Sequence, residues 1–272
     1  MVTQAIIPLA GLGTRLLPLS SVIPKELLPI NGKPNLEYIM EECIEAGIKQ
    51  FIFVVPKNRP SIKKYFFNDN FYKNIIKKKK NDKRLKNVFN RLKKFQKMIK
   101  FVYQNKPEGT GHAVLKCKKY LKGTHFLMLL ADDLIVKKNC SKEMISLHKK
   151  TRGSIIATTK VKKKTVSRWG ILGFKKKTKN SFLINEVIEK PKLSEAPSNY
   201  AIIGRYILPK KILSVLKSQG RGKGGEIHIT DAIKTLVKRD EKFYGNIFKG
   251  KYIDCGTMDG FIKSGIAISK YL

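Results

Sequence analysis

Short apolar runs alternate with amphipathic segments along most of the chain. Apolar runs bounded by turn residues predict strands at 5–9, 51–55, 99–103, 126–130, 154–160, 183–188 and 199–207. Apolar residues at helical spacing predict helices at 35–45, 61–66, 112–119, 142–149, 210–216, 229–239 and 260–270. Strands that alternate with helices predict an α/β fold with a mostly parallel sheet and right-handed crossovers. In such sheets, ligands bind beyond the carboxyl ends of the strands.

One segment departs from this alternation. Residues 73–100 are rich in lysine and carry apolar residues at helical spacing, which predicts an amphipathic helix with a basic outer face. A surface helix that packs on the sheet is the favoured interpretation, and a subunit contact or an anionic partner stays open. No Pro-, Gly- or Ser-rich linker divides the chain, so we expect a single domain over 1–272 with a basic helical insertion around 73–100.

The loop after the first predicted strand has the composition of a nucleotide site. An apolar run ends at Gly11 and Gly13, and Arg15 and Lys25 follow. Glycines let backbone N–H groups approach phosphate oxygens, and the two cations supply the charge that a polyphosphate needs. The loop lacks the Gly-Lys-Ser/Thr of a P-loop and the third glycine, near Leu16, of a dinucleotide fingerprint.

The chain resembles the sugar-nucleotide pyrophosphorylases, and most closely the bacterial UTP–glucose-1-phosphate uridylyltransferases. That family opens with a Gly-x-Gly-Thr-Arg loop and an Ile-Pro-Lys-Glu-x-Leu-Pro segment, as this chain does at 11–15 and 23–29. Further matching segments keep the family order at 33–34, 41–44, 109–113, 189–191, 197–199, 204–206, 230–233 and 254–256. The resemblance implies a Rossmann-like, mostly parallel mixed sheet flanked by helices, of the nucleotide-diphospho-sugar transferase type. It also implies that UTP and glucose 1-phosphate give UDP-glucose and pyrophosphate by direct in-line attack.

Two aspartates are the candidate metal ligands. Asp132 and Asp133 follow the apolar run 126–130, and a carboxylate at the end of a strand can hold Mg²⁺ against a phosphate or simply end the strand in a turn. The resemblance points to Asp132 and Asp254 as ligands of Mg²⁺. Ala131 replaces the Gly or Pro that is common in the family at that position.

The resemblance also assigns the remaining site residues. It implies catalytic roles for Arg15 and Lys25. The residues implied to bind the nucleotide are Ala10, Gly11, Gly13, Glu26, Gln104 and Gly109, and those implied to bind the sugar phosphate are Gly170, Glu189 and Lys190.

Four further residues depart from the family pattern, and a fifth, His112, could be mistaken for a catalytic base. Trp169 replaces a tyrosine, Ser20-Ser21 replaces a Thr-Lys pair, and His228 replaces a glutamine. We expect His112 to cap or pack at a helix start rather than to act as a base.

The formal net charge is +37, from 57 Lys and Arg against 20 Asp and Glu. Charge of this size by itself suggests nucleic acid. The basic residues are spread along the chain, however, without a zinc knuckle or an aromatic RNA-binding strand, so we expect no specific nucleic-acid partner.

The cysteines and the apolar runs bear on the compartment. The four cysteines are scattered without a C-x-x-C motif, which favours a reduced protein. There is no signal-peptide pattern and no apolar run near the ~20 residues of a membrane span, so we expect a cytoplasmic protein without a membrane partner. We also expect a homo-oligomer, a dimer or a tetramer.

Two other functions remain as alternatives. A glucose-1-phosphate thymidylyltransferase, or another sugar-1-phosphate nucleotidyltransferase, is the nearest, although such thymidylyl relatives usually have Ser-Lys-Gln where this chain has Pro24-Lys25-Glu26. A basic nucleic-acid-binding protein or a regulatory paralogue is more remote, because Asp132, Asp254 and Lys25 are all present.

Overall fold

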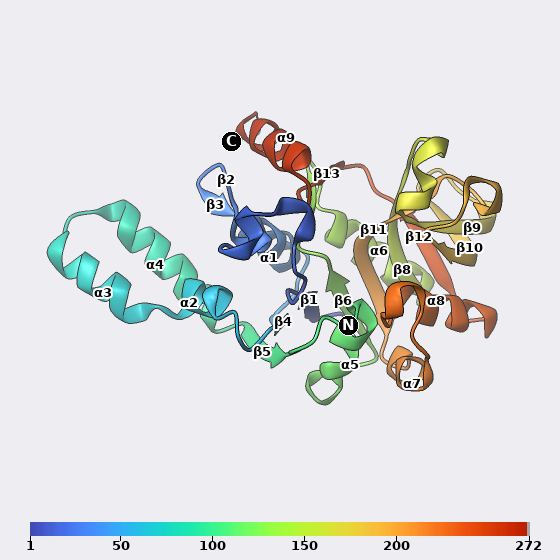
Figure 1. Ribbon diagram of the computed structural model, residues 1–272, viewed down its shortest axis with the longest axis horizontal. Coiled ribbons are helices and arrows are strands. Elements are labelled where there is room, and N and C mark those ends of the chain that lie inside the picture. The colour runs from blue at the N-terminus through green and yellow to red at the C-terminus, as the bar shows by residue number, and fades with distance from the viewer. Residues whose placement is uncertain (271–272) are drawn as a thin grey trace.

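The structure, a computed structural model, describes residues 1–270 and is built on a nine-stranded sheet with the order β5-β4-β1-β6-β11-β8-β12-β10-β9 (Figure 1). Strands β5, β4, β1 and β6 are parallel, and β8 is parallel to β12. Strand β11 is antiparallel to β6 and β8, and β10 is antiparallel to β12 and β9. The predicted mixed α/β sheet is therefore confirmed, with its longest parallel part in the N-terminal half. The strands span Gln4–Pro8 (β1), Gln50–Val55 (β4), Ile99–Tyr103 (β5), His125–Leu129 (β6), Ser154–Lys160 (β8), Gly170–Lys177 (β9), Ser181–Glu189 (β10), Tyr200–Pro209 (β11) and Phe243–Ile247 (β12).

Helices cover both faces of this sheet because its strands are apolar on both sides. In β1, Ala5 and Ile7 pack into one buried cluster and Ile6 into the other, as the alternation of side chains along a strand requires. The first cluster includes residues of α1, α6 and α9, and the second includes residues of α5, α7 and α8. These helices span Asn35–Glu45 (α1), Thr110–Lys116 (α5), Cys140–Thr151 (α6), Ile212–Ser218 (α7), Ile229–Lys238 (α8) and Met258–Ser269 (α9).

Two short antiparallel pairs lie beside the main sheet. One joins β2 (Pro29–Ile30) to β3 (Lys33–Pro34). The other joins β7 (Asp133–Val136) to β13 (Lys251–Asp254), with Asp133 opposite Asp254 and Val136 opposite Lys251. This β7–β13 ribbon brings two segments that are distant in the sequence to the same end of the sheet.

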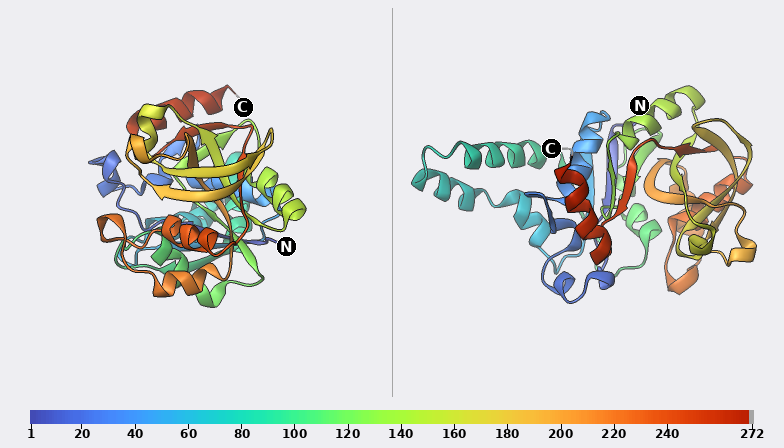
Figure 2. Two further views of the ribbon diagram at one scale, coloured as in Figure 1. Left: turned by 90° about the vertical axis from the view of Figure 1, so that its right-hand side faces the viewer. Right: turned by 90° about the horizontal axis from the view of Figure 1, so that it is seen from above.

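The basic insertion forms two helices instead of the single helix predicted over 73–100. Helix α2 (Ser61–Phe67) leads to α3 (Asp69–Lys78) and α4 (Lys83–Gln96), which extend as an arm from the β5 edge (Figures 1 and 2). The predicted helix is interrupted between Lys78 and Lys83. Asp82 begins the second helix, because its side chain caps α4 by accepting a hydrogen bond from the Leu85 N–H at 3.0 Å. Helix α3 buries none of its residues, whereas α4 buries Leu92 and Phe95 in the core. Only part of the arm therefore packs on the sheet in the way that we expected.

Among the described residues, no helix is both long and apolar enough to cross a membrane.

Candidate functional site

The loop after β1 folds into three short 3-10 helices, Thr14–Leu16, Leu19–Ser21 and Lys25–Leu27. Gly13 has a φ of 69°, in the left-handed region that favours glycine. Its carbonyl accepts a hydrogen bond from the Ser20 hydroxyl at 2.8 Å. Ser20, one of the departures from the family pattern, therefore holds the loop in shape.

Two cations of this loop meet two carboxylates from distant parts of the chain. Lys25 Nζ lies 2.6 Å from Asp132 Oδ2. Nη2 of Arg15 lies 3.3 Å from the same oxygen, and its Nη1 lies 3.1 Å from Asp254 Oδ2. The structure thus brings together the predicted catalytic pair and the predicted metal ligands.

Burial and charge act against each other in this cluster. Burial alone would lower the pKa of Lys25, but the negative charges of Asp132 and Glu26 outweigh it and raise the pKa above its usual value. Burial would raise the pKa of Asp132, but Lys25 and Arg15 hold it below its usual range. Both side chains are therefore charged at neutral pH, whereas Arg15 is 53% exposed and free to turn toward a ligand.

The β7–β13 ribbon sets the positions of both aspartates. Asp132 directly precedes β7, and its carbonyl accepts a hydrogen bond from the Cys255 N–H at 2.8 Å. A Cβ on Gly256 would lie 2.8 Å from Asp132 Oδ2 and 3.1 Å from Asp254 Oδ1, so these two oxygens are within about 6 Å of each other. A Cβ at 256 would also overlap the Arg15 guanidinium, so any larger residue there would displace the Arg15 side chain from the two aspartates.

The two aspartates form a donor set suited to a divalent cation. Hard carboxylate oxygens are the ligands that Mg²⁺ takes, commonly one or two of them together with substrate phosphates. Within residues 1–270, no group of three or more His, Cys, Asp and Glu side chains could hold a metal ion. Further ligands at this position would have to come from a phosphate-bearing substrate and water.

A fully buried arginine, which sequence analysis did not single out, supports the end of β6. Arg205 donates hydrogen bonds to the carbonyls of Leu130 at 3.2 Å and Asp133 at 2.5 Å, on either side of Asp132. Its other partner is the Glu42 carboxylate, whose Oε2 lies 3.0 Å from Nη2. Burial would lower the pKa of Arg205, but Glu42 raises it above its usual value. The ion pair fixes the backbone that carries Asp132.

Asp133 has a structural role in the same region. Its Oδ2 accepts the Gly204 N–H at 2.9 Å, and its Oδ1 accepts the Tyr252 hydroxyl at 2.6 Å. Burial, together with the charge of Asp132, raises the pKa of Asp133 to about 6. Asp133 thereby joins β7, β11 and β13.

A cavity of about 230 Å³, here called the Gln104 cavity, lies beside the loop after β1. Its wall contains most of the residues predicted to bind a nucleotide: Ala10, Gly11, Glu26, Gln104 and Gly109, together with Lys25 and Asp132. Gly13 is not in the wall and acts on the shape of the loop. Sequence analysis missed Pro8, Pro107, Thr110, Ala113, Leu130 and Glu226.

Gln104 has a defined orientation in this cavity. Its Nε2 donates to the Gly109 carbonyl at 3.3 Å and lies 2.9 Å from His112 Nδ1. Burial lowers the pKa of His112, whose Nδ1 also lies 3.2 Å from Glu108 Oε2. Gly109 has a φ of 98°, and a Cβ there would lie 2.6 Å from the Ile227 carbonyl oxygen. His112 thus packs at the start of α5 against Gln104, the position that we predicted for it, and its lack of a catalytic role stays a prediction.

A second cavity of about 540 Å³, the Glu189 cavity, shares Leu130 and Asp132 with the first. The predicted sugar-phosphate residues Gly170, Glu189 and Lys190 line it together with Arg15, Asp132 and Asp254. Sequence analysis assigned no ligand role to the other wall residues: Leu130, Asp133, Arg168, Trp169, Ile202, Gly204, Tyr206, Thr230 and Tyr252. Asp132 therefore stands at the junction of two cavities.

The wall of the Glu189 cavity is closely packed. A Cβ on Gly170 would lie 3.0 Å from Ile202 Cδ1 and 3.1 Å from Glu189 Oε2, so glycine leaves that carboxylate room. Trp169, the residue that replaces a tyrosine of the family, packs edge to face on Tyr252, with ring centroids 5.8 Å apart. Its aromatic contact therefore supports the β7–β13 ribbon.

The sequence model of the nucleotidyl transferase family matches residues 4–270. UTP–glucose-1-phosphate uridylyltransferase 2 of Staphylococcus saprophyticus is 38% identical over 266 residues, which cover 97% of this chain and 91% of that protein. The UTP–glucose-1-phosphate uridylyltransferase of Staphylococcus haemolyticus is 35% identical over 266 residues, which cover 97% of this chain and 91% of that protein.

Solved structures agree with these relatives. A UDP-glucose pyrophosphorylase complexed with UDP-glucose superposes with a TM-score of 0.88 at 35% identity, covering 100% of both chains. The UTP-bound enzyme of Acinetobacter baumannii superposes with a TM-score of 0.87 at 32% identity, and the match covers 98% of this chain and 93% of the Acinetobacter chain. The chain belongs to the nucleotidyl transferase family.

Proposed function

We propose that this chain transfers the uridylyl group of UTP to glucose 1-phosphate, giving UDP-glucose and pyrophosphate. The observation that carries the proposal is the position of Asp132, at the junction of two cavities and in contact with Lys25 and Arg15. Relatives of that activity, which match nearly the whole chain, support it.

The reaction requires no covalent enzyme intermediate. A phosphate oxygen of glucose 1-phosphate, held in the Glu189 cavity, attacks the α-phosphorus of UTP, held in the Gln104 cavity. The new O–P bond forms as the bond from the α-phosphorus to the bridging oxygen breaks, and pyrophosphate leaves. Catalysis then consists of positioning and of neutralising charge, which preorganised donors do well.

The charged residues neutralise the phosphates. Lys25 and Arg15 turn from the aspartates toward the triphosphate and stabilise the charge that develops on it. Backbone N–H groups of the loop at Ala10 and Gly11, which line the Gln104 cavity, approach the phosphates. Asp132 and Asp254 would hold Mg²⁺, which supplies further positive charge to both phosphate groups when it is bound.

Gln104 supports a uracil base. Its Nε2 is engaged by the Gly109 carbonyl, so its Oε1 is left to accept a hydrogen bond from a base. Uracil has an N3–H donor at that edge, whereas cytosine has an acceptor there. Thymine has the same donor, so Gln104 separates uridylyl from cytidylyl transfer but not from thymidylyl transfer. Glu26 closes the cavity near the nucleotide.

The sugar phosphate fits the polar end of the Glu189 cavity. Lys190 meets the phosphate, and the Glu189 carboxylate accepts hydrogen bonds from the sugar hydroxyls, while Gly170 leaves them space. Lys190 Nζ lies 3.9 Å from Glu189 Oε1, so the lysine has a partner of opposite charge until the phosphate arrives.

We further propose that residues 1–272 act as a single nucleotidyltransferase domain that assembles as a homo-oligomer in the cytoplasm. The four cysteines are free and buried, which supports a reducing compartment. The cores on the two faces of one continuous sheet support a single domain.

One assay tests the proposed function. Pyrophosphate release is measured with UTP, dTTP, CTP and ATP, each against glucose 1-phosphate, galactose 1-phosphate and N-acetylglucosamine 1-phosphate. We expect the highest kcat/KM with UTP and glucose 1-phosphate. A preference for dTTP would favour the thymidylyl alternative, and no release with any pair would reject the proposal.

A further inference from the structure

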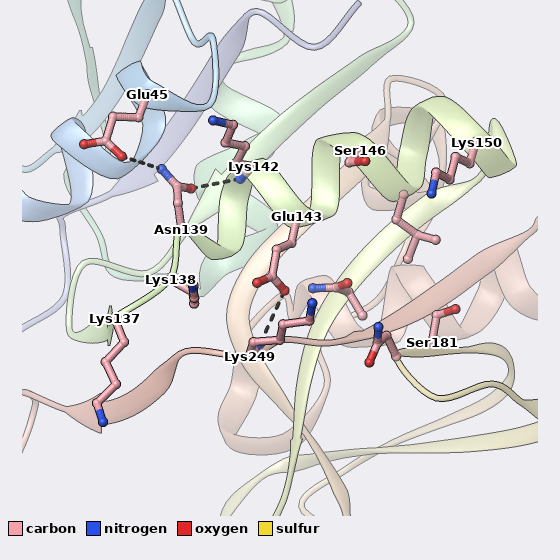
Figure 3. A pocket seen from close by; sticks show the side chains of 13 residues that line it. Glu45, Lys137, Lys138, Asn139, Lys142, Glu143, Ser146, Lys150, Ser181 and Lys249 are labelled. Atoms are coloured by element: carbon pink, nitrogen blue, oxygen red, sulfur yellow. Dashed lines mark hydrogen bonds between the residues drawn. The ribbon is translucent and has the colours of Figure 1, made fainter.

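A third cavity, of about 650 Å³, lies apart from the two proposed substrate cavities and shares no lining residue with either (Figure 3). We call it the Lys142 cavity. Helix α6, the turns at 137–139 and 249, and the β10 and β12 strands form it. Its volume is in the range of small-molecule sites.

The wall of the Lys142 cavity is positively charged. Lys137, Lys138, Lys142, Lys150 and Lys249 line it, against two carboxylates. Both carboxylates already accept a hydrogen bond from the protein, as Figure 3 shows. Glu45 accepts from Asn139 Nδ2 at 3.1 Å, and Glu143 accepts from the Lys249 N–H at 3.3 Å. The lysines outnumber the carboxylates, so the wall as a whole favours an anion.

A buried donor without a partner lines the same cavity. Asn246 is only 5% exposed, and its Nδ2 has no hydrogen-bond partner among the described residues. Burying such a group unpaired is costly, and buried polar groups in folded proteins are nearly always hydrogen-bonded. Nδ2 has almost no accessible surface, so the amide must turn toward the cavity before an acceptor oxygen can supply the missing partner, and the lysines favour a charged one.

The β7–β13 ribbon connects this cavity to the two aspartates. Val136 and Lys251 pair at the end of the ribbon beside Lys137 and Lys249, and Asp133 and Asp254 pair at the other end. The turns are also in close contact, because a Cβ on Gly250 would lie 2.8 Å from the Val136 carbonyl oxygen and 3.2 Å from that of Lys138. A ligand that holds the two turns together would therefore restrain the strands that carry Asp132 and Asp254.

From these observations we propose that the Lys142 cavity binds a small phosphate-bearing anion and that this ligand regulates the enzyme through the β7–β13 ribbon. The amide of Asn246 turns toward the cavity, and the phosphate oxygens accept hydrogen bonds from its Nδ2 and from the lysine ammonium groups. The ligand tightens the binding of UTP, because it orders the ribbon before the nucleotide arrives. The regulatory part of this proposal rests on the proposed function, whereas the binding site does not.

Binding is tested by calorimetry with inorganic phosphate and with glucose 6-phosphate, both in saturating UDP-glucose so that the substrate cavities are filled. The variants are Asn246→Leu and the pair Lys142→Gln/Lys249→Gln. The control pair Lys83→Gln/Lys86→Gln removes the same charge from the exposed arm. We expect the first two variants to raise the Kd of glucose 6-phosphate by about tenfold or more, as for the loss of a charge-assisted hydrogen bond, and the control to leave it unchanged.

The results distinguish a defined binding site from nonspecific attraction of anions to the charged surface. Equal losses in the two lysine pairs, or no loss in Asn246→Leu, would overturn the site and leave only nonspecific attraction of anions. Thermal unfolding checks the fold of Asn246→Leu, which removes an unpaired donor and should not lower the Tm. If UDP-glucose itself fails to bind, the proposed function falls, and the same titration without it still tests the site.

Regulation is tested by measuring the Kd of UTP with and without glucose 6-phosphate. We expect glucose 6-phosphate to lower the Kd of UTP at least threefold in the wild-type protein and not at all in Asn246→Leu. By reciprocity, UTP should lower the Kd of glucose 6-phosphate by the same factor. Binding of glucose 6-phosphate with an unchanged Kd for UTP would overturn the regulatory role.

Discussion

The ammonium group of Lys25 lies 2.6 Å from Oδ2 of Asp132, at the junction of the Gln104 and Glu189 cavities. The lysine is held in place by a carboxylate that it leaves when a phosphate enters. Because Asp132 holds the ammonium group beside both cavities, the lysine has only to turn from this carboxylate to a phosphate. The pair therefore connects the charge of the site to its proposed chemistry.

Replacing Lys25 with alanine should lower kcat by about 10²-fold or more, the scale for the loss of one preorganised donor. Steady-state pyrophosphate release measures the effect. Lys33→Ala is the matched control, since Lys33 pairs with Glu41 and lines neither substrate cavity. A Lys25→Ala protein that turns over like the wild type would remove this lysine from the mechanism.

Asp132→Asn and Asp254→Asn should each leave a folded protein that turns over far more slowly and needs much more Mg²⁺. Each change keeps the shape of the side chain and removes one negative charge, so it weakens the hold on a hard cation. The double variant should lose less than the product of the two single effects, because groups that act as a unit are not additive. Titration of activity with Mg²⁺ gives the comparison, and independent, multiplicative losses would argue against a shared ion.

Local patterns predicted the helices and strands whose apolar residues are the ones that the structure buries. The helix predicted at 35–45 has the same bounds as α1, and the strand predicted at 5–9 overlaps β1 closely. Strand β12 was missed because Gly245 and Asn246 disfavour strands, although pairing on both sides with β8 and β10 outweighs this preference. Strand β9 was missed because it ends in three lysines.

The candidate site likewise has features that the sequence predicted and features that it did not. The two aspartates were expected to lie together from the resemblance, whereas the contact of Arg15 with both of them was not predicted, and the roles of all three residues stay predictions. Arg205 and Glu42 both lie in segments that match the family, but no local pattern predicted that they pair, because they are far apart in the sequence. No local motif marks Asn246, since only the packed structure reveals an amide without a partner.

Replacing the buried Arg205 with methionine should lower the free energy of unfolding by about 3 kcal/mol, because it leaves the carboxylate of Glu42, whose side chain is only 9% exposed, without its cation. The double variant Arg205→Met/Glu42→Gln should recover part of the loss. Urea unfolding measures both values, with the exposed Arg84→Met as a control expected within about 0.5 kcal/mol of the wild type. A double variant no more stable than Arg205→Met would contradict the paired-charge explanation.

RNA and DNA should bind weakly, and binding should collapse between low and physiological salt, because the attraction comes from charge spread over the surface. Fluorescence anisotropy with labelled oligonucleotides across a salt series checks this. Binding that is selective for sequence and resistant to salt would instead favour the nucleic-acid alternative.

Glu26 makes stability depend on pH. Its carboxyl group is almost fully buried, and burial raises its pKa from 4.5 to about 7 although Lys25 opposes the shift. Between these values the folded protein keeps a proton that the unfolded chain has released. Stability therefore falls as the pH rises through this window.

Glu26→Gln should abolish this decline, because the amide has nearly the same shape and does not titrate. Relative to the wild type, the variant should gain about 2 kcal/mol more in unfolding free energy at pH 8 than at pH 5, the amount that follows from a raised pKa of this size. Urea unfolding of both proteins at the two pH values isolates the contribution of Glu26, since Asp133 and the other titrating groups are common to both. A difference between the proteins that does not change with pH would mean that Glu26 is already ionised in the folded state, and that Lys25 outweighs the cost of its burial.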